Sequence, residues 1–445
     1  MADKPYFDWA AEAFDPSRIF EKPEALRGVR VVELCTLILG PCTSDYLGEF
    51  GAEVIKVELP PTGDTMRYVP PDGYYWEDLC IGFLPENHNK YHVGIDLHHE
   101  EGKELFRSLV RRADVFVENL RAGTMDRWGL GYRQLSELNP GLVYLAASGF
   151  GQWGPYSVGR ASYDLLAQAM SGLAGITGFS DRPPMKSGTY IGDFFGSVLN
   201  AVSILAALHW RDRSGKGQFI EYAQSEGLMR ILDWTWLYHH LTGDRRKRYG
   251  NRDVALGVSD VFRCQDGFVA ISAPTDKEFR GLTAAMERPE LAEDPRYSSL
   301  EARLQEENAE ALLAVVGEWA VGCTKQELDE LGAKHGFASA PVLSAQDHFS
   351  DPHFRERRSV WQLDDPVYGD LLEYGPAPKL SETPGRIKWP ARPVGFHNRY
   401  VFQSLLSLSS AQVRDLEEKS IVGKWADRPG ARPPAWWKPG VGEVL

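Results

Sequence analysis

The chain has 445 residues, of which 43% are hydrophobic and 25% charged, so its composition is that of a globular protein long enough for two domains. Its formal net charge of −13 argues against nucleic acid or an anionic membrane surface as the main partner. The five cysteines lie far apart and form no C-x-x-C pair, which favours a reducing, cytoplasmic location without a zinc or redox site.

The first half of the chain alternates short apolar strands with helices. Predicted strands span 28–34, 53–58, 115–118 and 142–146, and predicted helices span 44–50, 101–112 and 132–138. Because this alternation produces parallel sheets with right-handed crossovers, the sequence predicts an open, Rossmann-like α/β sheet. The longest apolar run, 194–210, is interrupted by polar residues and is shorter than the roughly 20 residues that a bilayer requires. We expect it to be a buried core helix, with no membrane partner.

The pattern changes near residue 226. An antiparallel pair around 260–272 and helices between 278 and 334 predict a smaller α+β domain, followed by a segment rich in proline and glycine. We therefore expect a large domain formed by residues 1–225 with 386–445, a small domain over 226–340, and a linker over 341–385 that returns to the large domain. Residues 1–25 and 426–445 are expected to be loosely structured arms.

A glycine-rich loop follows the fourth predicted strand. Gly149-Phe-Gly-Gln-Trp-Gly154 fits the G-x-G-x-x-G pattern of dinucleotide sites. That pattern belongs after the first strand of such a fold, however, and Pro155 does not open a helix cleanly. The loop is more typical of one that offers backbone N–H groups to another anion.

Asp164 follows this loop, in the first turn of a predicted helix. From the pattern alone, a stabilising interaction with the helix dipole, worth a few tenths to about 1 kcal/mol, is the more common role. The same dipole also suits a carboxylate nucleophile, and spacing does not separate the two roles.

The histidines and the basic run indicate no further site. No histidine lies between residues 100 and 208, which excludes a Ser–His–Asp site built from 149–193 alone. The pairs His98-His99 and His239-His240 lack a ligand partner at helical spacing, so no metal site is expected. The basic run 245–248 is more typical of a solvated turn than of a phosphate clamp.

An ordered set of motifs indicates a family. The segments are 26–34, 40–41, 51–58, 63–67, 87–90, 113–119, 126–131, 149–151, 163–164 and 192–193. Their order and spacing, over roughly residues 26–420, resemble the family III CoA-transferases. This family includes formyl-CoA, crotonobetainyl and bile-acid CoA-transferases and the α-methylacyl-CoA racemases. No single segment is specific, but the ordered set is.

The resemblance assigns roles to particular residues. It implies that Asp164 is the catalytic nucleophile and that Asp193 supports the neighbouring loop. The implied coenzyme A contacts are Leu37, Ile38, Leu39, Asn119 and Arg127, with Lys90 and Arg67 as weaker candidates. Arg127 suits a phosphate of coenzyme A. The resemblance also implies no tightly bound cofactor, coenzyme A thioesters as substrates, and an interlocked homodimer, although a heteromer with a related subunit is possible.

Departures from the family pattern narrow the activity. Ile38 replaces the glutamine of the formyl-CoA transferases, and the Gly-Gly-Gly-Gly stretch is absent near 256–260, so formyl or oxalyl transfer is not expected. The racemases pair their aspartate with an upstream histidine, whereas this chain has Gln134-Leu135 there. Without a second acid/base group, racemisation is the weaker alternative to transfer. A non-catalytic subunit of a heteromer is a third possibility.

The implied chemistry is transfer of coenzyme A through aspartyl anhydride and aspartyl thioester intermediates. Backbone N–H groups of the loops 149–154 and 172–178 are candidate oxyanion donors. Thirteen tryptophans and a bulky first loop slightly favour a large or aromatic acceptor acid, such as a bile acid or an aryl-substituted succinate. Succinyl-CoA or another acyl-CoA is the expected donor.

Overall fold

The structure is a computed structural model that describes residues 5–76 and 79–427. The chain divides into two compact units. The first comprises the chain up to residue 171, residues 188–232 and the chain from residue 352, and the second comprises residues 172–187 and 233–351. The domain limits expected from the sequence remain a prediction.

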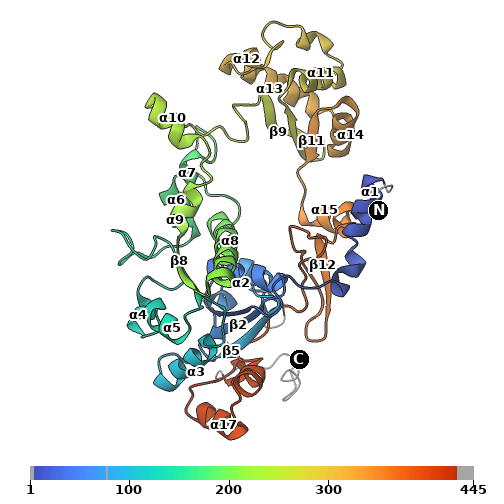
Figure 1. Ribbon diagram of the computed structural model, residues 1–445. Helices are drawn as coiled ribbons and strands as arrows, with labels where there is room; N and C mark the ends of the chain where they lie inside the picture. Colours follow the sequence, from blue (N-terminus) through green and yellow to red (C-terminus); the bar gives the residue numbers. More distant parts are fainter. Residues whose placement is uncertain (1–4, 77–78, 428–445) are drawn as a thin grey trace. The chain divides into compact units, whose positions relative to one another are not determined.

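A six-stranded parallel sheet forms the centre of the first unit (Figure 1). In spatial order its strands are β5 (Lys90–Gly94), β2 (Glu53–Glu58), β1 (Arg30–Leu34), β6 (Val115–Glu118), β7 (Val143–Ser148) and β8 (Gln218–Ala223). In the register, Val32 of β1 pairs with Ile55 of β2 and with Phe116 of β6. The four predicted strands are confirmed. After β1 the chain adds β2 and β5 on one side of the sheet, and from β6 onward it adds β7 and β8 on the other side. This is the strand order of doubly wound sheets.

Helices cover both faces of this sheet. On one face, α2 (Leu39–Glu49) and α8 (Ile191–Ser214) pack on alternate valines such as Val31 and Val54. On the other, α3 (Glu100–Val110), α5 (Tyr132–Leu138) and the C-terminal segment pack on Val32 and Ile55. By length and composition α8 could cross a membrane, but it packs on α2 and on strands β7 and β8 as the predicted core helix. Burial on both faces explains why these strands are continuously apolar.

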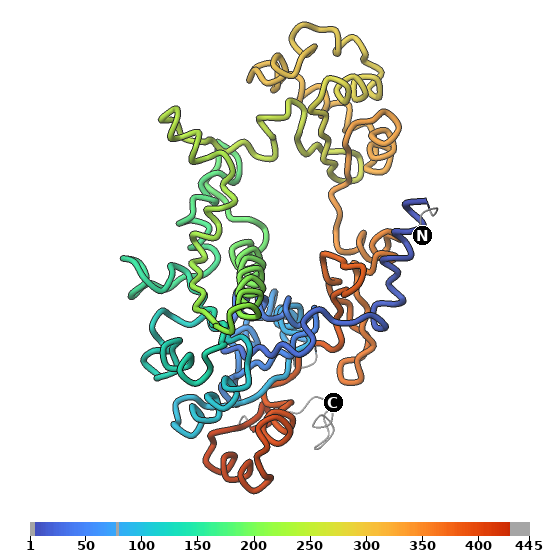
Figure 2. Tube along the Cα trace, in the orientation of Figure 1, coloured from blue at the N-terminus to red at the C-terminus, as the bar shows by residue number. Residues whose placement is uncertain are grey.

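The C-terminal segment returns to the N-terminal half of the sheet (Figure 2). The His397 N–H donates to the carbonyl of His92 on β5, and Val422 forms a β-bridge with Ile95. The first arm is not loose as expected, because residues 6–13 and 16–21 are helical and Arg358 Nη1 donates to the carbonyl of Pro16. Of the second arm, residues 428–445 lie outside the described residues.

The remaining elements of the first unit are short. They are α1 (Tyr6–Ala13), η1 (Pro16–Glu21), η2 (Thr65–Tyr68), η3 (Pro71–Gly73), β3 (Tyr75–Trp76), β4 (Leu79–Cys80), η4 (Leu84–Glu86), α4 (Thr124–Arg127), α6 (Asp164–Ser171), α9 (Gln224–Met229), α16 (Pro352–Glu356), β12 (Val360–Asp365), β13 (Gly369–Tyr374), η6 (Tyr400–Leu405), α17 (Ser410–Glu418) and η7 (Trp425–Asp427). Strands β12 and β13 form an antiparallel hairpin.

The second unit contains a three-stranded antiparallel sheet with helices around it. The strands, in spatial order, are β11 (Ala338–Pro341), β10 (Gly267–Ala273) and β9 (Val258–Cys264), so the predicted antiparallel pair is confirmed. The helices are α7 (Leu173–Ile176), α10 (Thr235–Thr242), α11 (Asp276–Ala285), η5 (Pro289–Ala292), α12 (Leu300–Arg303), α13 (Glu306–Ala320), α14 (Lys325–His335) and α15 (Ala345–Ser350). The core of this unit includes Phe262, Ile271 and Phe279.

Candidate active site

The candidate site lies at the carboxyl ends of the central strands of the large sheet. The direction of winding reverses between β1 and β6, and in doubly wound sheets ligands bind outside the carboxyl ends of the strands at this point. Leu37 and Ile38 lie in the loop that follows β1, Leu39 is the first residue of α2, and the loop that follows β6 begins at Asn119. The structure therefore brings these four predicted residues to the same edge of the sheet.

Hydrogen bonds join the two loops. The side-chain amide of Asn119 pairs with the backbone of Thr36, accepting from its N–H at 2.9 Å and donating to its carbonyl at 2.7 Å. Asp64 Oδ1 also accepts bonds from the Thr36 hydroxyl at 2.7 Å and from the Leu37 N–H at 2.9 Å. Asn119 is therefore a residue that shapes the first loop, and its amide is already committed to the backbone.

The backbone of the first loop is strained. Leu37 has a φ of 64°, which residues with a side chain rarely adopt, and such strain is concentrated at functional sites. Ile38 and Leu39 are buried. Gly40 follows at the start of α2, where a Cβ atom would collide with Cys35 Sγ and lie 3.1 Å from Asn119 Cγ. The chain passes so close to Asn119 only because residue 40 has no side chain.

Asp164 is the first residue of α6 and is only 5% exposed, whereas the adjacent Tyr163 is 63% exposed. Each oxygen of its carboxylate accepts one hydrogen bond. The Gly192 N–H donates to Oδ1 at 2.7 Å, and Gln168 Nε2 donates to Oδ2 at 2.6 Å. Both are short bonds, and together they fix the orientation of the carboxylate.

The start of α8 packs closely against Asp164. A Cβ atom on Gly192 would lie 2.9 Å from Asp164 Oδ1 and 3.1 Å from Leu228 Cδ1, so residue 192 has to be a glycine for this contact. Asp193, the next residue, accepts a bond from Gln224 Nε2 at 2.7 Å. Burial, together with the nearby charge of Asp164, raises the pKa of Asp193 to about 7. Asp193 therefore sits beside the candidate nucleophile and titrates near neutrality.

The two weaker coenzyme A candidates have other partners. Lys90 is fully buried, and its Nζ lies 2.7–3.1 Å from Glu33 Oε2, the carbonyls of Pro41 and Glu86, and Asn87 Oδ1. Arg67 makes bonds of 2.8 Å to both carboxylate oxygens of Glu58 and one of 2.9 Å to the carbonyl of Arg392. These contacts assign both cations to the interior of the fold and not to the candidate site.

Arg127 differs from these two. It is exposed at the end of α4, and within the described residues its Nη2 donates to Thr124 Oγ1 at 2.9 Å. Of the three predicted cations, Arg127 is the exposed one.

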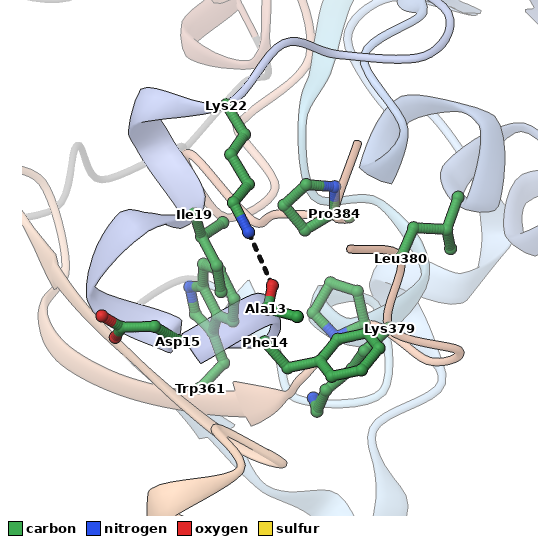
Figure 3. A pocket seen from close by; sticks show the side chains of 11 residues that line it. Ala13, Phe14, Asp15, Ile19, Lys22, Trp361, Lys379, Leu380 and Pro384 are labelled. Carbon is green, nitrogen blue, oxygen red and sulfur yellow. Dashed lines mark hydrogen bonds between the residues drawn. The ribbon is translucent and has the colours of Figure 1, made fainter. Parts of the chain in front are cut away.

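Two cavities elsewhere in the described residues are not lined by these side chains. One, of about 20 Å³, lies between the N-terminal helices and residues 376–385, where Lys22 Nζ donates to the carbonyl of Ala13 at 2.8 Å (Figure 3). That volume has room for about one water molecule and not for a substrate. The other, in the second unit, measures about 600 Å³ and is lined by Trp236, His239, Arg245 and Arg246 with glycines of the 172–176 segment.

Sequence reasoning missed two partners of the candidate nucleophile, Gln168 and the Gly192 N–H, and one partner of Asp193, Gln224. Gln168 stands four residues after Asp164 on the same helix, a spacing that brings side chains together and could have identified it. The Gly192 N–H and Gln224 come from distant segments, and nothing in their local sequence indicates the contact. The glycine loop 149–154 lies between β7 and α6, and no helix begins there before Asp164.

Comparisons with known proteins bear on the family of the chain. A family model described as CoA-transferase family III matches residues 26–398. The chain is 38% identical over 401 residues to the succinyl-CoA–D-citramalate CoA-transferase of Chloroflexus aurantiacus, covering 90% of this chain and 98% of that protein. It is 36% identical over 399 residues to the alpha subunit of a succinyl-CoA–L-malate CoA-transferase of the same organism, covering 89% and 92%. A solved structure of a CAIB/BAIF family protein from Brucella suis matches with a TM-score of 0.76 and 31% identity, covering 87% of this chain and 100% of that one.

Proposed function

The chain belongs to CoA-transferase family III, and from this membership we propose that it moves coenzyme A from succinyl-CoA to a small dicarboxylic acid through covalent intermediates on Asp164. The observation that carries the proposal is the environment of this carboxylate. Asp164 is buried at the start of a helix, and both of its oxygens accept hydrogen bonds from fixed donors. A carboxylate held in this way keeps its direction when substrate enters the site.

The proposed reaction has four steps. An oxygen of Asp164 attacks the thioester carbonyl, the C–S bond breaks, and a mixed anhydride and the coenzyme A thiolate form. The thiolate attacks the aspartyl carbonyl and releases the donor acid, which leaves an aspartyl thioester. The acceptor carboxylate then attacks this thioester, which forms a second anhydride and frees the thiolate. The thiolate finally attacks the acyl carbonyl of the acceptor and regenerates the free carboxylate.

The two hydrogen-bond donors of Asp164 have a role in these steps. When the thiolate attacks the aspartyl carbonyl, negative charge develops on an oxygen of Asp164 itself. The Gly192 N–H and the Gln168 amide already point at those oxygens, so they stabilise the developing charge without reorganisation. We assign the oxyanion role to these donors in preference to the loops 149–154 and 172–178.

Coenzyme A is proposed to bind along the carboxyl edge of the sheet. Leu37, Ile38 and Leu39 supply an apolar wall, Asn119 holds their loop in shape, and Arg127 pairs with a phosphate. The support for this assignment is their shared position at the reversal point of the sheet. The contacts of Lys90 and Arg67 support a structural role for these two cations instead.

The relatives support a small acceptor. Their names give succinyl-CoA as donor and D-citramalate or L-malate as acceptor, which are short dicarboxylic acids. This resemblance favours such acids over the large or aromatic acceptor suggested by the tryptophan content.

A second copy of the chain is the proposed partner. Apolar side chains on α6 and α8 are exposed in the single chain, namely Leu165, Leu166, Met170, Val198, Val202 and Leu205. An exposed apolar surface of this kind is typical of a subunit interface. A related chain could take the same place, because one relative is named as the alpha subunit of its enzyme. We propose a cytoplasmic location, consistent with five free cysteines.

One experiment tests the proposal and separates it from its alternatives. The chain purified alone is incubated with succinyl-CoA, trapped with hydroxylamine, and digested for mass spectrometry. We expect a hydroxamate on the peptide that carries Asp164, formed only when the thioester is present. Modification of another residue would refute the mechanism. Racemisation of a 2-methylacyl-CoA without a trapped intermediate would favour the racemase alternative, and inactivity without a partner subunit would favour the non-catalytic one.

A further inference from the structure

A buried cluster of side chains lies between the first helix of the sheet and the loop before β5. Asp45 and Glu49 stand one turn apart on α2, and His88 approaches them from that loop. His88 Nε2 lies 3.0 Å from Asp45 Oδ2 and 3.3 Å from Glu49 Oε1. The three residues are only 3%, 1% and 6% exposed, in the order His88, Asp45 and Glu49. One ligand atom from each lies within 4.8 Å of the others.

Hydrogen bonding within the described chain does not satisfy this cluster. Asp45 Oδ1 and both ring nitrogens of His88 are buried without a hydrogen-bond partner, although Nε2 is so close to two carboxylates. An imidazolium ring would be expected to donate from both nitrogens, and a buried polar atom without a partner costs about 1–3 kcal/mol. Lys90, whose charge acts on Asp45, is committed to Glu33 and to neighbouring oxygens. Among the described residues, the ion pairs of Asp45 and Glu49 are with His88.

The spacing of the three atoms fits the coordination of a small metal ion. Metal–ligand bonds of about 2.0–2.2 Å to histidine nitrogen and carboxylate oxygen place neighbouring ligand atoms about 3.0–3.4 Å apart. The separations of 3.0 and 3.3 Å from His88 Nε2 fall in this range. His88 Nε2 lies close to both carboxylate oxygens without a hydrogen-bond partner. Ligand atoms that face the same metal ion likewise do not bond to one another.

A third carboxylate supports the same interpretation. Glu373 on β13 is 8% exposed, its Oε1 has no hydrogen-bond partner in the described chain, and its charge interacts with His88. Histidines that bind metals usually donate their second ring N–H to a carboxylate. The carboxylates of Asp45, Glu49 and Glu373 can together place three negative charges around one imidazole. A divalent cation offsets this negative charge better than a single proton does.

We propose that Asp45, Glu49 and His88 bind one divalent first-row cation, such as Zn²⁺ or Mn²⁺. Imidazole and carboxylate ligands together suit these ions better than Mg²⁺ or Ca²⁺, which prefer oxygen alone. The metal ties α2, which follows the Leu37–Leu39 loop directly, to the loop before β5. Its role is structural. The sequence pairs His98-His99 and His239-His240 did not indicate this site, because its ligands come from distant parts of the sequence.

The test measures metal content in the full chain. The protein is produced without an affinity tag in medium supplemented with Zn²⁺ and Mn²⁺, and its metals are quantified by mass spectrometry. We expect about one equivalent per chain in the wild type. The isosteric variants Asp45→Asn and His88→Gln should lower it at least about tenfold. Glu118→Gln is the control, since Glu118 is also a buried carboxylate whose burial raises its pKa to about 8, but it lies outside the cluster.

A second measurement uses the wild type alone, in case the variants do not fold. After treatment with a chelator, the chain is titrated with Co²⁺ and followed by visible absorption and by its melting temperature. We expect saturable absorption bands and a rise in melting temperature at one equivalent. Less than about a tenth of an equivalent of native metal, with no response to Co²⁺, would show a buried ion pair only and overturn the proposal. Metal content that is unchanged in both variants would overturn it as well.

Discussion

Replacing Gly192 by alanine tests whether the N–H of this residue holds the nucleophile. The new Cβ atom would lie 2.9 Å from Asp164 Oδ1, closer than carbon and oxygen pack without a hydrogen bond, and 3.1 Å from Leu228 Cδ1. Because the leucine side chain is buried, it has little freedom to move. We therefore expect the carboxylate to turn away and its 2.7 Å bond from the Gly192 N–H to be lost.

The size of the effect follows from that bond. A hydrogen bond to a charged group contributes about 1.5–3 kcal/mol. If this contribution is lost only in the transition state, the rate falls about 10- to 150-fold. A displacement of the nucleophile by about 1 Å is itself enough for a loss of about 100-fold. We expect this decrease in kcat, with a small change in KM, because the coenzyme A contacts lie on other loops.

The assay is transfer of coenzyme A from succinyl-CoA, followed by chromatography of the acyl-CoA products. Gly188→Ala is the matched control, since Gly188 is exposed, lies four residues upstream, and a Cβ atom there meets nothing within 4 Å. The control should keep wild-type rates. If Gly192→Ala also kept kcat within about twofold while remaining folded, the assigned role of this N–H would be refuted.

Three further predictions concern neighbouring residues. Gln168→Leu removes the bond to Asp164 Oδ2 and should lower kcat about 10-fold or more in the same assay, with Gln168→Asn giving no rescue because it is too short to reach. Asn119→Ala removes two bonds to Thr36, so denaturant unfolding should show a loss of about 1–2 kcal/mol and the KM for the acyl-CoA should rise. The pKa of Asp193 is raised from 3.8 to about 7, so its contribution to stability is present at low pH and is lost as the pH rises from about 4 to about 7. Asp193→Asn should remove this slope from thermal melts, and an unchanged slope would contradict the assignment.

The strands that the sequence predicted correctly share one physical cause. In β1, β2, β6 and β7 the apolar residues face helices on both sides, so the local sequence is continuously apolar. Strand β5 carries Lys90 and His92, which look like surface residues until their buried partners are known. Strand β8 lies at the edge of the sheet and is half-exposed, so its pattern is weak. Both strands were therefore missed.

The site could be predicted only in part for a similar reason. Asp164 and the Leu37–Leu39 loop were identified from ordered motifs, because these motifs are continuous in the sequence. Lys90 belongs to one of the same motifs, yet its partners, Glu33 and the Pro41 carbonyl, come from another segment and give it an interior role. Contacts between segments far apart in the chain have no local pattern, and the structure was needed to find them.

The central claim is that an oxygen of Asp164 bonds to both acids in turn, and labelled oxygen tests it most directly. The acceptor acid is supplied with heavy oxygen in its carboxylate, and the chain turns over repeatedly with succinyl-CoA. Each cycle should leave one labelled oxygen of the acceptor on the carboxylate of Asp164. When this oxygen attacks succinyl-CoA in the next cycle, it is released in succinate. We expect heavy oxygen in the released succinate and in the peptide that carries Asp164, while one heavy oxygen remains in the acceptor thioester as its carbonyl. Heavy oxygen that is absent from both the succinate and the Asp164 peptide would contradict the claim.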